Sequence, residues 1–291
     1  MARDPKHEPF YEANRAWWDR VVPIHEASRG YDREGFLRGE KPLCPVELAE
    51  LGPLVPGKRL LHLQCHFGMD TLNWARLGAS VTGLDFSGPA IDAARRLSAE
   101  SGIPGRFVHA NVYDAAEALG GERFDVVYTG VGALNWLPDV RAWARVAAAC
   151  LRPGGLLYLY EGHPVLFTMD PERQDGLLVA RERYFELPEP ASGESTRTYV
   201  DGPPFEPLRN HEWNHGVGEL VTALVDAGLR LDFVHEHREV PWQALPWMEP
   251  VGPSLPGADG RYQSRRMWRL PEPQRDLVPL MLSLRATRPE P

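Results

Sequence analysis

Polar residues that could bind a ligand recur in the first half of the chain, each directly after a short apolar run. The residue with the clearest chemistry is Asp85, which ends the run 80–85. A carboxylate at the end of a strand can accept hydrogen bonds from both hydroxyl groups of a ribose, although it can also simply cap the next helix. Four other runs are followed by Gln64-Cys65-His66-Phe67-Gly68, Asn111-Val112, Thr129 and Glu161-Gly162-His163. The pattern favours a site for a nucleoside-containing cofactor.

The apolar runs alternate with segments that have helical periodicity. Strands are predicted at 59–63, 80–85, 106–110, 124–129 and 156–160, and two more at 229–235 and 280–285. Helices are predicted between them, among them 69–77, 87–101 and one with an apolar stripe over 143–151. Such alternation predicts a doubly wound α/β fold, with a mostly parallel, seven-stranded, Rossmann-like sheet whose carboxyl edge binds ligands.

The remaining segments suggest additions to this sheet. Residues 1–44 are expected to form an N-terminal helical or lid segment, with a helix near 12–20, before a main domain over 45–291. The stretch 162–212 lacks a clear helical pattern and is interpreted as a β-rich substrate cap, with a hairpin from 181–187 and 195–201. A helix is predicted at 216–227, and 238–275 is a Pro- and Trp-rich loop excursion.

The turn after the first strand argues against a dinucleotide. A pyrophosphate needs close backbone approach, which is why such loops read GxGxxG. Here Gln64 and His66 stand in the turn, with glycine only at Gly68. NAD and FAD are therefore disfavoured, and a cofactor without phosphate fits better.

From about Leu60 to Glu161 the sequence resembles class I S-adenosylmethionine-dependent methyltransferases of the small-molecule type. The family's glycine loop corresponds to 62–68, its ribose acid to Asp85, its adenine-binding pair to Asn111-Val112, and Phe86 would flank the adenine. Residues 132–139 match the segment after the fourth strand, and 151–155 match the turn before the fifth. His62 replaces the usual acid, and Gln64 and His66 replace two usual glycines, which indicates a distinct subgroup. The resemblance implies S-adenosylmethionine as cofactor, contacted also by Cys65 and Thr129.

Methyl transfer from a sulfonium is an in-line displacement that needs a general base only when the acceptor must lose a proton. His163 is the predicted base, and Glu161 beside it is also predicted to be a catalytic residue. The acceptor is expected to contact Tyr31, Trp136, His211 and Trp213, and the aromatic N-terminal segment could close over it. His211 and His215 have the spacing of metal ligands, and His235 and His237 would add two more. No cysteine pair or acidic cluster completes this set with normal geometry, so no metal is predicted.

Composition limits the remaining possibilities. A net charge of −8 without a basic tract disfavours nucleic acid, and no apolar run is long enough to span a membrane. Three cysteines outside any CxxC pattern favour a reducing, cytoplasmic setting, and a homodimer is left open. The leading hypothesis is an enzyme that methylates a small molecule at O, N or C. Its alternative is a non-catalytic cofactor-binding or degenerate Rossmann-like scaffold, while an oxidoreductase lacks its fingerprint.

Overall fold

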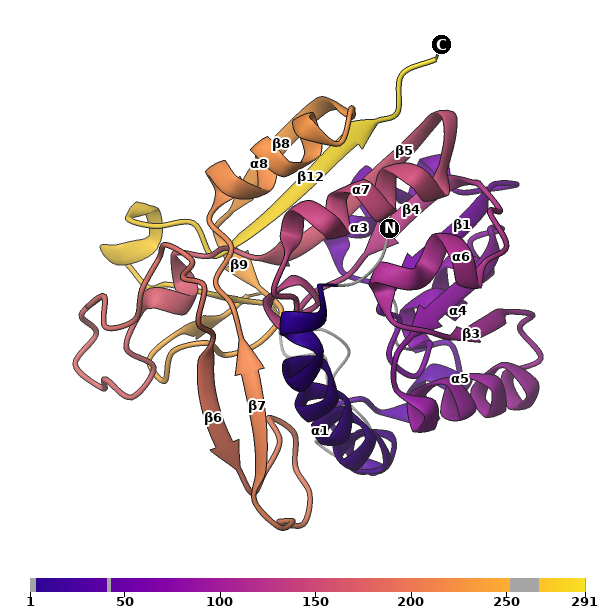
Figure 1. Ribbon diagram of the computed structural model, residues 1–291. Helices are drawn as coiled ribbons and strands as arrows, with labels where there is room; N and C mark the ends of the chain where they lie inside the picture. Colours follow the sequence, from indigo (N-terminus) through magenta and orange to yellow (C-terminus); the bar gives the residue numbers. More distant parts are fainter. Residues whose placement is uncertain (1–3, 41–42, 252–266, 291) are drawn as a thin grey trace.

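A seven-stranded sheet in the order β3-β2-β1-β4-β5-β12-β8 forms the centre of the protein (Figure 1). The computed structural model describes residues 4–40, 43–251 and 267–290. Strands β1 to β5 are parallel, whereas β12 runs antiparallel to both β5 and β8. The sheet strands are β1 Arg59–Leu63, β2 Ser80–Asp85, β3 Arg106–His109, β4 Phe124–Thr129, β5 Leu151–Gly162, β8 Arg230–His237 and β12 Met281–Thr287.

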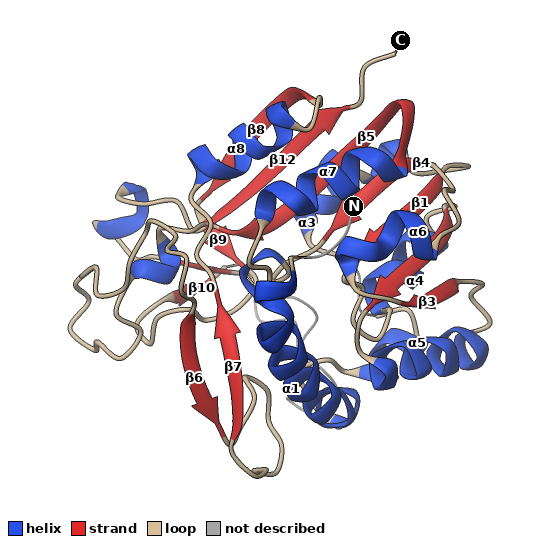
Figure 2. Cartoon of the chain, viewed as in Figure 1, coloured by secondary structure: helices blue, strands red, loops and turns tan. Residues whose placement is uncertain are grey.

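Helices cover both faces of this sheet, as the sequence alternation predicts (Figure 2). On one face the apolar sides of α7 and α8 pack against alternate residues of the central strands, for example Trp143 against the layer that contains Leu157. On the other face Trp74 of α4 packs with Tyr128 and Tyr158. The helices are α1 Glu8–Ala27, α2 Arg33–Leu37, α3 Pro45–Glu50, α4 Met69–Arg76, α5 Gly88–Ser101, α6 Ala115–Ala118, α7 Val140–Cys150 and α8 Val217–Asp226.

Local signals explain where several helices begin. Ser87 accepts a hydrogen bond from the backbone N–H of Ala90 at 3.3 Å and so caps α5, and Asp139 caps α7 through the N–H of Ala142 at 2.8 Å. The α5 helix ends at Gly102, which has a φ of 67°. The first helix is longer than 12–20, because α1 extends over 20 residues and contains Pro23.

The excursion after β5 contains a hairpin, but not the predicted one. Strand β6 (Ala191–Ser195) pairs antiparallel with β7 (Leu208–Glu212), whereas 181–187 and 195–201 are irregular apart from Ser195 itself. The prediction of the hairpin's strands was therefore wrong. The Pro- and Trp-rich region contributes a small sheet in the order β10-β11-β9, with β9 Glu239–Val240, β10 Glu249–Pro250 and β11 Trp268–Arg269. The part of the predicted excursion at 252–266 lies outside the described residues.

The N-terminal helix lies between the hairpin and the sheet half that carries α5 (Figure 1). It contacts β7 on one side and α5 on the other. Within the described residues, no helix combines the length and apolarity needed to cross a bilayer. Cys44, Cys65 and Cys150 are buried, and no disulfide bond joins them.

Candidate functional site

The turn after β1 follows the path of a glycine-rich loop although it contains one glycine. Gln64, His66 and Gly68 all have positive φ angles, of 58°, 51° and 81°. Residues with a Cβ adopt this region rarely, at a cost of about 1–2 kcal/mol each. At Gly68 a Cβ would also lie 2.8 Å from the ring of Phe107. The two substitutions therefore change the side chains that the loop presents and keep its backbone conformation.

Asp85 is held at the end of β2 by this loop. Its Oδ2 accepts a hydrogen bond from the N–H of His66 at 2.8 Å, and its Oδ1 accepts one from the N–H of Ser87 at 2.9 Å. Burial raises the pKa of the carboxyl to about 6, against the opposing effect of the two N–H donors. The N–H of Ala110 donates to the Asp85 carbonyl at 2.9 Å, which brings Asn111 and Val112 beside the carboxylate.

Two buried polar atoms near this edge lack a hydrogen-bond partner. Gln64 donates through Nε2 to the carbonyl of Ala133 at 2.8 Å, which ties the β1 loop to the β4 loop, while its Oε1 is buried and unsatisfied. Thr129 Oγ1, at the end of β4, is also buried and unsatisfied. Such atoms are costly unless a ligand or water completes them. This arrangement fits a ligand that brings hydrogen-bond donors to the edge of β1 and β4.

Glu161 organises the loop that follows β4. Its two carboxylate oxygens accept hydrogen bonds from the N–H groups of Gly132, Ala133 and Leu134, and from that of Gly162, at 2.5–3.1 Å. Burial raises its pKa, and the four donors oppose that shift. With its oxygens committed to backbone donors, Glu161 acts as a positioning residue for the loop that receives Gln64.

Helix α1 is fastened over this edge at three places. Asn14 exchanges two hydrogen bonds with the backbone of His211, at 2.8 and 2.9 Å, which fixes the helix to β7. Asp19 accepts a hydrogen bond from Ser87 Oγ at 2.7 Å, next to Asp85. His25 hydrogen-bonds both His66, at 3.2 Å, and Thr198, at 2.6 Å. The helix therefore bridges the loop after β1 and the excursion after β5.

Aromatic rings fill the space between α1 and the loops. The indole of Trp18 lies 5.2 Å from the His66 ring and 5.1 Å from Trp136, measured between centroids. Trp136 also stacks on Trp17 at 5.2 Å, and Tyr31 lies 5.2 Å from His66. All four residues predicted to contact the acceptor lie against α1 or a residue that contacts it. Phe10 of α1 contacts the rings of His211 and Trp213, and the contacts above place Trp136 and Tyr31.

The histidines of this region are buried and uncharged near neutral pH. Burial lowers the pKa of His62 to about 4 and that of His25 to about 3, and it lowers the pKa of His66 as well. His62 hydrogen-bonds Thr71 at 2.8 Å and lies against the Tyr128 ring, so it serves as a core residue at the position of the family's usual acid.

His163 is directed toward another part of the sheet. Its Nε2 lies 3.0 Å from Glu236 of β8, and its Nδ1 accepts a hydrogen bond from the N–H of Val165 at 3.2 Å. Sequence reasoning did not single out the carboxylate of Glu212 by itself. That side chain accepts a hydrogen bond from Asn135 at 3.3 Å, and burial raises its pKa. Glu212 is nearer than His163 to the residues predicted to contact the methyl acceptor, because the N–H of the neighbouring Trp213 donates to the carbonyl of Asn135.

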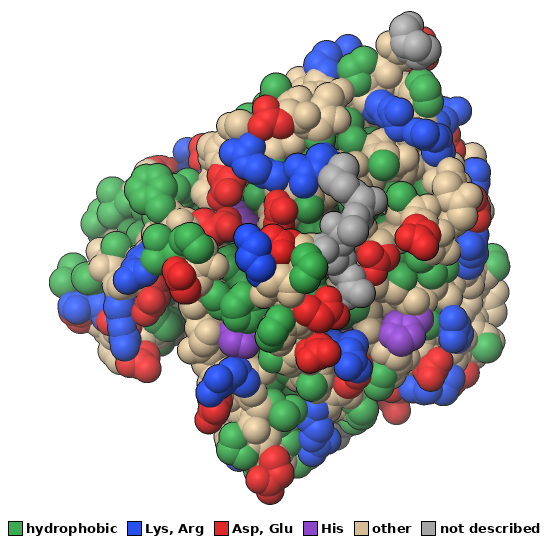
Figure 3. All heavy atoms as spheres, in the orientation of Figure 1, with side chains coloured by type: hydrophobic (Ala, Val, Ile, Leu, Met, Phe, Trp, Pro, Cys, Tyr) green, Lys and Arg blue, Asp and Glu red, His purple; other side chains and the backbone are tan. Residues whose placement is uncertain are grey.

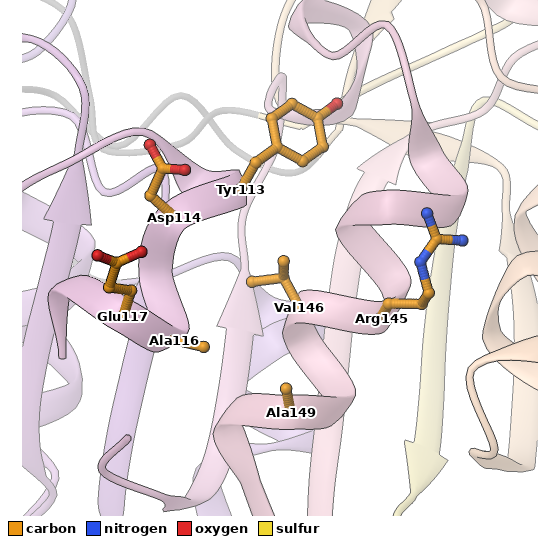
Figure 4. Close-up of a pocket in the computed structure, with 7 residues that line it drawn as sticks. All are labelled: Tyr113, Asp114, Ala116, Glu117, Arg145, Val146 and Ala149. Carbon is orange, nitrogen blue, oxygen red and sulfur yellow. The ribbon is translucent and has the colours of Figure 1, made fainter. Parts of the chain in front are cut away.

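A cavity of about 90 Å³ lies elsewhere, between η3 (Val112–Asp114), α6 and α7 (Figure 4). It is lined by Tyr113, Asp114, Ala116, Glu117, Arg145, Val146 and Ala149. Sites for drug-sized ligands usually enclose about 300–1,000 Å³. The cavity is therefore too small for a nucleoside, and the candidate site is the edge beneath α1.

The most informative residues missed by sequence reasoning are Asn14, Asp19 and His25. They occupy one helix in a polar sequence, and their partners are distant in the chain, so nothing local identifies them. Trp18 carried a weak signal, since an excess of aromatic residues in the N-terminal segment indicated a lid.

Comparison with known proteins shows which proteins the chain resembles. Residues 61–157 match the family model described as a methyltransferase domain. The chain is 33% identical over 157 residues to a ubiquinone biosynthesis O-methyltransferase of Methylobacterium sp. (strain 4-46), covering 51% of this chain and 59% of that protein. It is 36% identical over 137 residues to the protein of the same name from Xanthomonas axonopodis pv. citri, covering 46% and 56%. The chain thus spans somewhat more than half the length of the curated relatives it matches.

Solved structures share the fold. A structure described as an S-adenosylmethionine-dependent methyltransferase from Clostridium acetobutylicum ATCC 824 aligns with a TM-score of 0.54 at 11% identity, covering 94% of this chain and 99% of that one. One from Mesorhizobium loti aligns with a TM-score of 0.53 at 19% identity, covering 90% and 99%. These likenesses show that the chain has the fold of these structures, and the match over 61–157 identifies a methyltransferase domain within it.

Proposed function

We propose that the protein transfers a methyl group from S-adenosylmethionine to a small-molecule acceptor. The observation that carries this proposal is the Asp85 carboxylate, which two backbone N–H groups orient at the end of β2. Each carboxylate oxygen has lone pairs beyond the one used by its N–H donor, and these can accept the two ribose hydroxyls. Phe86, Asn111 and Val112 are the proposed contacts of the adenine, and Cys65 and Gly68 shape the loop beneath it.

The methionine end of the cofactor must be bound by residues other than the acid that the family usually has at the position of His62. His62 at that position is uncharged, because burial lowers its pKa to about 4. The unsatisfied Oε1 of Gln64 and Oγ1 of Thr129 are acceptors suited to an ammonium group. We therefore assign the amino group of the cofactor to Gln64 and Thr129.

When bound, the cofactor supplies a methyl group already activated by its sulfonium. The chain then has to bring the acceptor within near-attack distance and to exclude water. Helix α1 does both in this proposal, since it covers the edge with Trp18 and is fastened by Asn14, Asp19 and His25. The N-terminal segment up to residue 44 thus acts as a lid, and 162–212 as the cap on the acceptor.

The acceptor is proposed to contact Tyr31, Trp136, His211 and Trp213. Aromatic faces favour a planar, partly apolar molecule. Methylation at oxygen is favoured over nitrogen or carbon by the names of the two relatives, both O-methyltransferases. His163 remains the base predicted from sequence, and Glu212 is a second candidate because its half-buried carboxylate has a raised pKa.

Calorimetric titration with S-adenosylhomocysteine tests the proposal. We expect the intact chain to bind one equivalent, and Asp85→Asn to weaken binding at least 10-fold. Asp92→Asn, which alters an exposed carboxylate on α5 that pairs with Arg95, is the matched control and should bind normally. Absence of binding by the intact chain would instead support the scaffold alternative. The three cysteines outside any CxxC pattern support a reducing, cytoplasmic setting for this reaction.

A further inference from the structure

Three side chains that can bind a cation meet outside the proposed cofactor site, beside the connection from β4 to α7. Nδ1 of His215 and one carboxylate oxygen each of Glu186 and Glu219 lie within 4.8 Å of one another. His215 precedes α8, Glu219 lies in its first turn, and Glu186 belongs to the excursion after β5. The side chain of His215 is 3% exposed, and those of Glu186 and Glu219 are 19% and 32% exposed. The cluster is thus largely removed from solvent.

The hydrogen bond on the far side of the His215 ring orients it for ligation. Nε2 donates to the backbone carbonyl of Leu137 at 2.7 Å, so Nδ1 points at the two glutamates. Metal-ligating histidines almost always donate their other ring N–H in this way. Nδ1 of His215 and Oε2 of Glu186 are in contact, yet both are buried without a hydrogen bond of acceptable geometry. These two atoms therefore face one another as potential ligand atoms.

The loop that carries Glu186 is held in place independently of the cluster. The side-chain amide of Asn214 donates to the carbonyls of Pro164 and Arg183, each at 3.0 Å. The hydroxyl of Tyr184 accepts a hydrogen bond from the N–H of Val217 at 3.2 Å. Because these bonds join the same two segments that supply the ligands, the three ligand atoms are preorganised.

We propose that Glu186, His215 and Glu219 bind a divalent transition-metal ion of the Zn²⁺ or Mn²⁺ type. Once the imidazole gives up its proton in favour of a metal, two carboxylates beside it leave negative charge in a half-buried place, and a divalent cation neutralises this charge. One imidazole nitrogen with two carboxylates suits these ions better than Mg²⁺, which prefers oxygen ligands alone. Water would complete the coordination.

The alternative occupant of the same place is a proton. Burial lowers the pKa of His215, but the neighbouring carboxylates of Glu186 and Glu219 outweigh this effect and raise it to about 9. An imidazolium between two carboxylates would satisfy the charges without a metal. A titration with metal ions separates the two states, because only a coordination site saturates with one ion per chain.

The ion would have a structural role that is independent of methyl transfer. Through the Leu137 carbonyl, His215 contacts the segment that follows η4 (Leu134–Trp136), and this segment is continuous with the loop that receives Gln64. Glu186 and Glu219 belong to the excursion after β5 and to α8. A bound ion would therefore join these two elements to the β4–α7 connection.

The test is calorimetric titration of the chelator-treated full chain with Zn²⁺, Mn²⁺ and Mg²⁺. We expect one Zn²⁺ or Mn²⁺ per chain, with Mg²⁺ at least 10-fold weaker, and a rise in the melting temperature on binding. The nearly isosteric variants Glu186→Gln and Glu219→Gln should each weaken binding at least 10-fold. Circular dichroism would verify that both variants fold.

His235→Ala is the matched control, since His235 pairs with the single carboxylate of Glu50 at 2.7 Å. It should leave the stoichiometry and affinity unchanged. The proposal is overturned if the intact chain binds neither Zn²⁺ nor Mn²⁺, or if binding persists undiminished in both glutamine variants. Either result would assign His215 to an ion-pair role.

Discussion

The backbone N–H of His66 donates to Oδ2 of Asp85 at 2.8 Å, so the loop after β1 and the end of β2 form one unit. This bond requires His66 to adopt a φ of 51°, a conformation that glycine usually supplies. The same residue contacts α1 through His25 and Trp18. The His66 side chain thereby connects the loop after β1 to helix α1.

The affinity for S-adenosylhomocysteine should fall in acid as Asp85 becomes protonated. Its pKa of about 6 means that the carboxylate form, which accepts both ribose hydroxyls, is lost below that pH. We expect the dissociation constant to rise by up to about 10-fold per pH unit below 6. Calorimetry from pH 8 to 5 would measure it. An affinity that is flat over this range would exclude the carboxylate as the ribose ligand.

Replacing Gln64 by alanine should weaken binding of S-adenosylmethionine about 3- to 30-fold. The change removes the unsatisfied Oε1 and also the hydrogen bond to Ala133. Each such bond contributes on the order of 1 kcal/mol. Equilibrium dialysis would give the ratio to the intact chain. Adenosine alone should lose much less affinity than the complete cofactor, because the lost oxygen is assigned to the amino group.

Acidification should destabilise the fold through its buried histidines. The pKa values of His25 and His62 are lowered to about 3 and 4, so unfolded chains bind protons below about pH 6.5 while folded chains do not. Stability is therefore fully present above 6.5 and falls by up to about 1.4 kcal/mol per pH unit per histidine as the pH decreases. The raised pKa of Asp85 has the opposite effect on stability. Between about pH 6 and 3.8 the folded chain binds up to one more proton at Asp85 than the unfolded chain does, which favours the folded state.

Urea denaturation at several pH values would measure this slope. His62→Asn should flatten it, since asparagine does not titrate. A slope identical to that of the intact chain would show that His62 does not contribute.

Asn14→Ala should loosen helix α1 without unfolding the sheet. The change leaves the N–H and carbonyl of His211 without their partners, which costs about 1–3 kcal/mol for each buried group. Amide hydrogen exchange over 8–27 should accelerate while β1 and β4 keep their protection. Glu12→Ala, at an exposed position of the same helix, is the control. Equal exchange in both variants would contradict a lid fastened by Asn14.

The identity of the base can be decided by comparing His163→Ala with Glu212→Gln once an acceptor is known. If Glu212 accepts the proton, its glutamine variant should lower kcat by about 100-fold or more and remove the acidic limb of the pH profile. His163→Ala should then change kcat little. The reverse pattern would support His163, and unchanged kcat in both would indicate that positioning suffices.

Figure 3 shows how charged and hydrophobic side chains are distributed over one face of the molecule. Acidic and basic side chains alternate there, and hydrophobic side chains gather at the left end, over the excursion after β5 (Figure 3). Exposed apolar residues in this excursion include Phe167, Leu177, Val179, Phe185 and Leu187.

The sequence alone determined the sheet and the edge at which we propose that the cofactor binds. Buried parallel strands are continuous apolar runs, and the cap at Ser87 and the stripe of α7 are local signals. The sequence by itself was therefore enough to assign Asp85 to the end of β2. The positive φ angles of Gln64 and His66 could not be assigned from their residue types, because only the bonds around the turn impose them.

Tertiary structure decided how the edge is covered. Asn14 and His211 are 197 residues apart, and neither residue type indicates the other. Strand β6 reads Ala-Ser-Gly-Glu-Ser, which has little strand propensity and is mostly exposed, so its pairing with β7 supplies the order that its side chains do not. The proposed metal ligand Glu186 likewise lies in a segment separate from that of His215 and Glu219. Local patterns encode elements, whereas contacts between distant segments depend on how those elements pack.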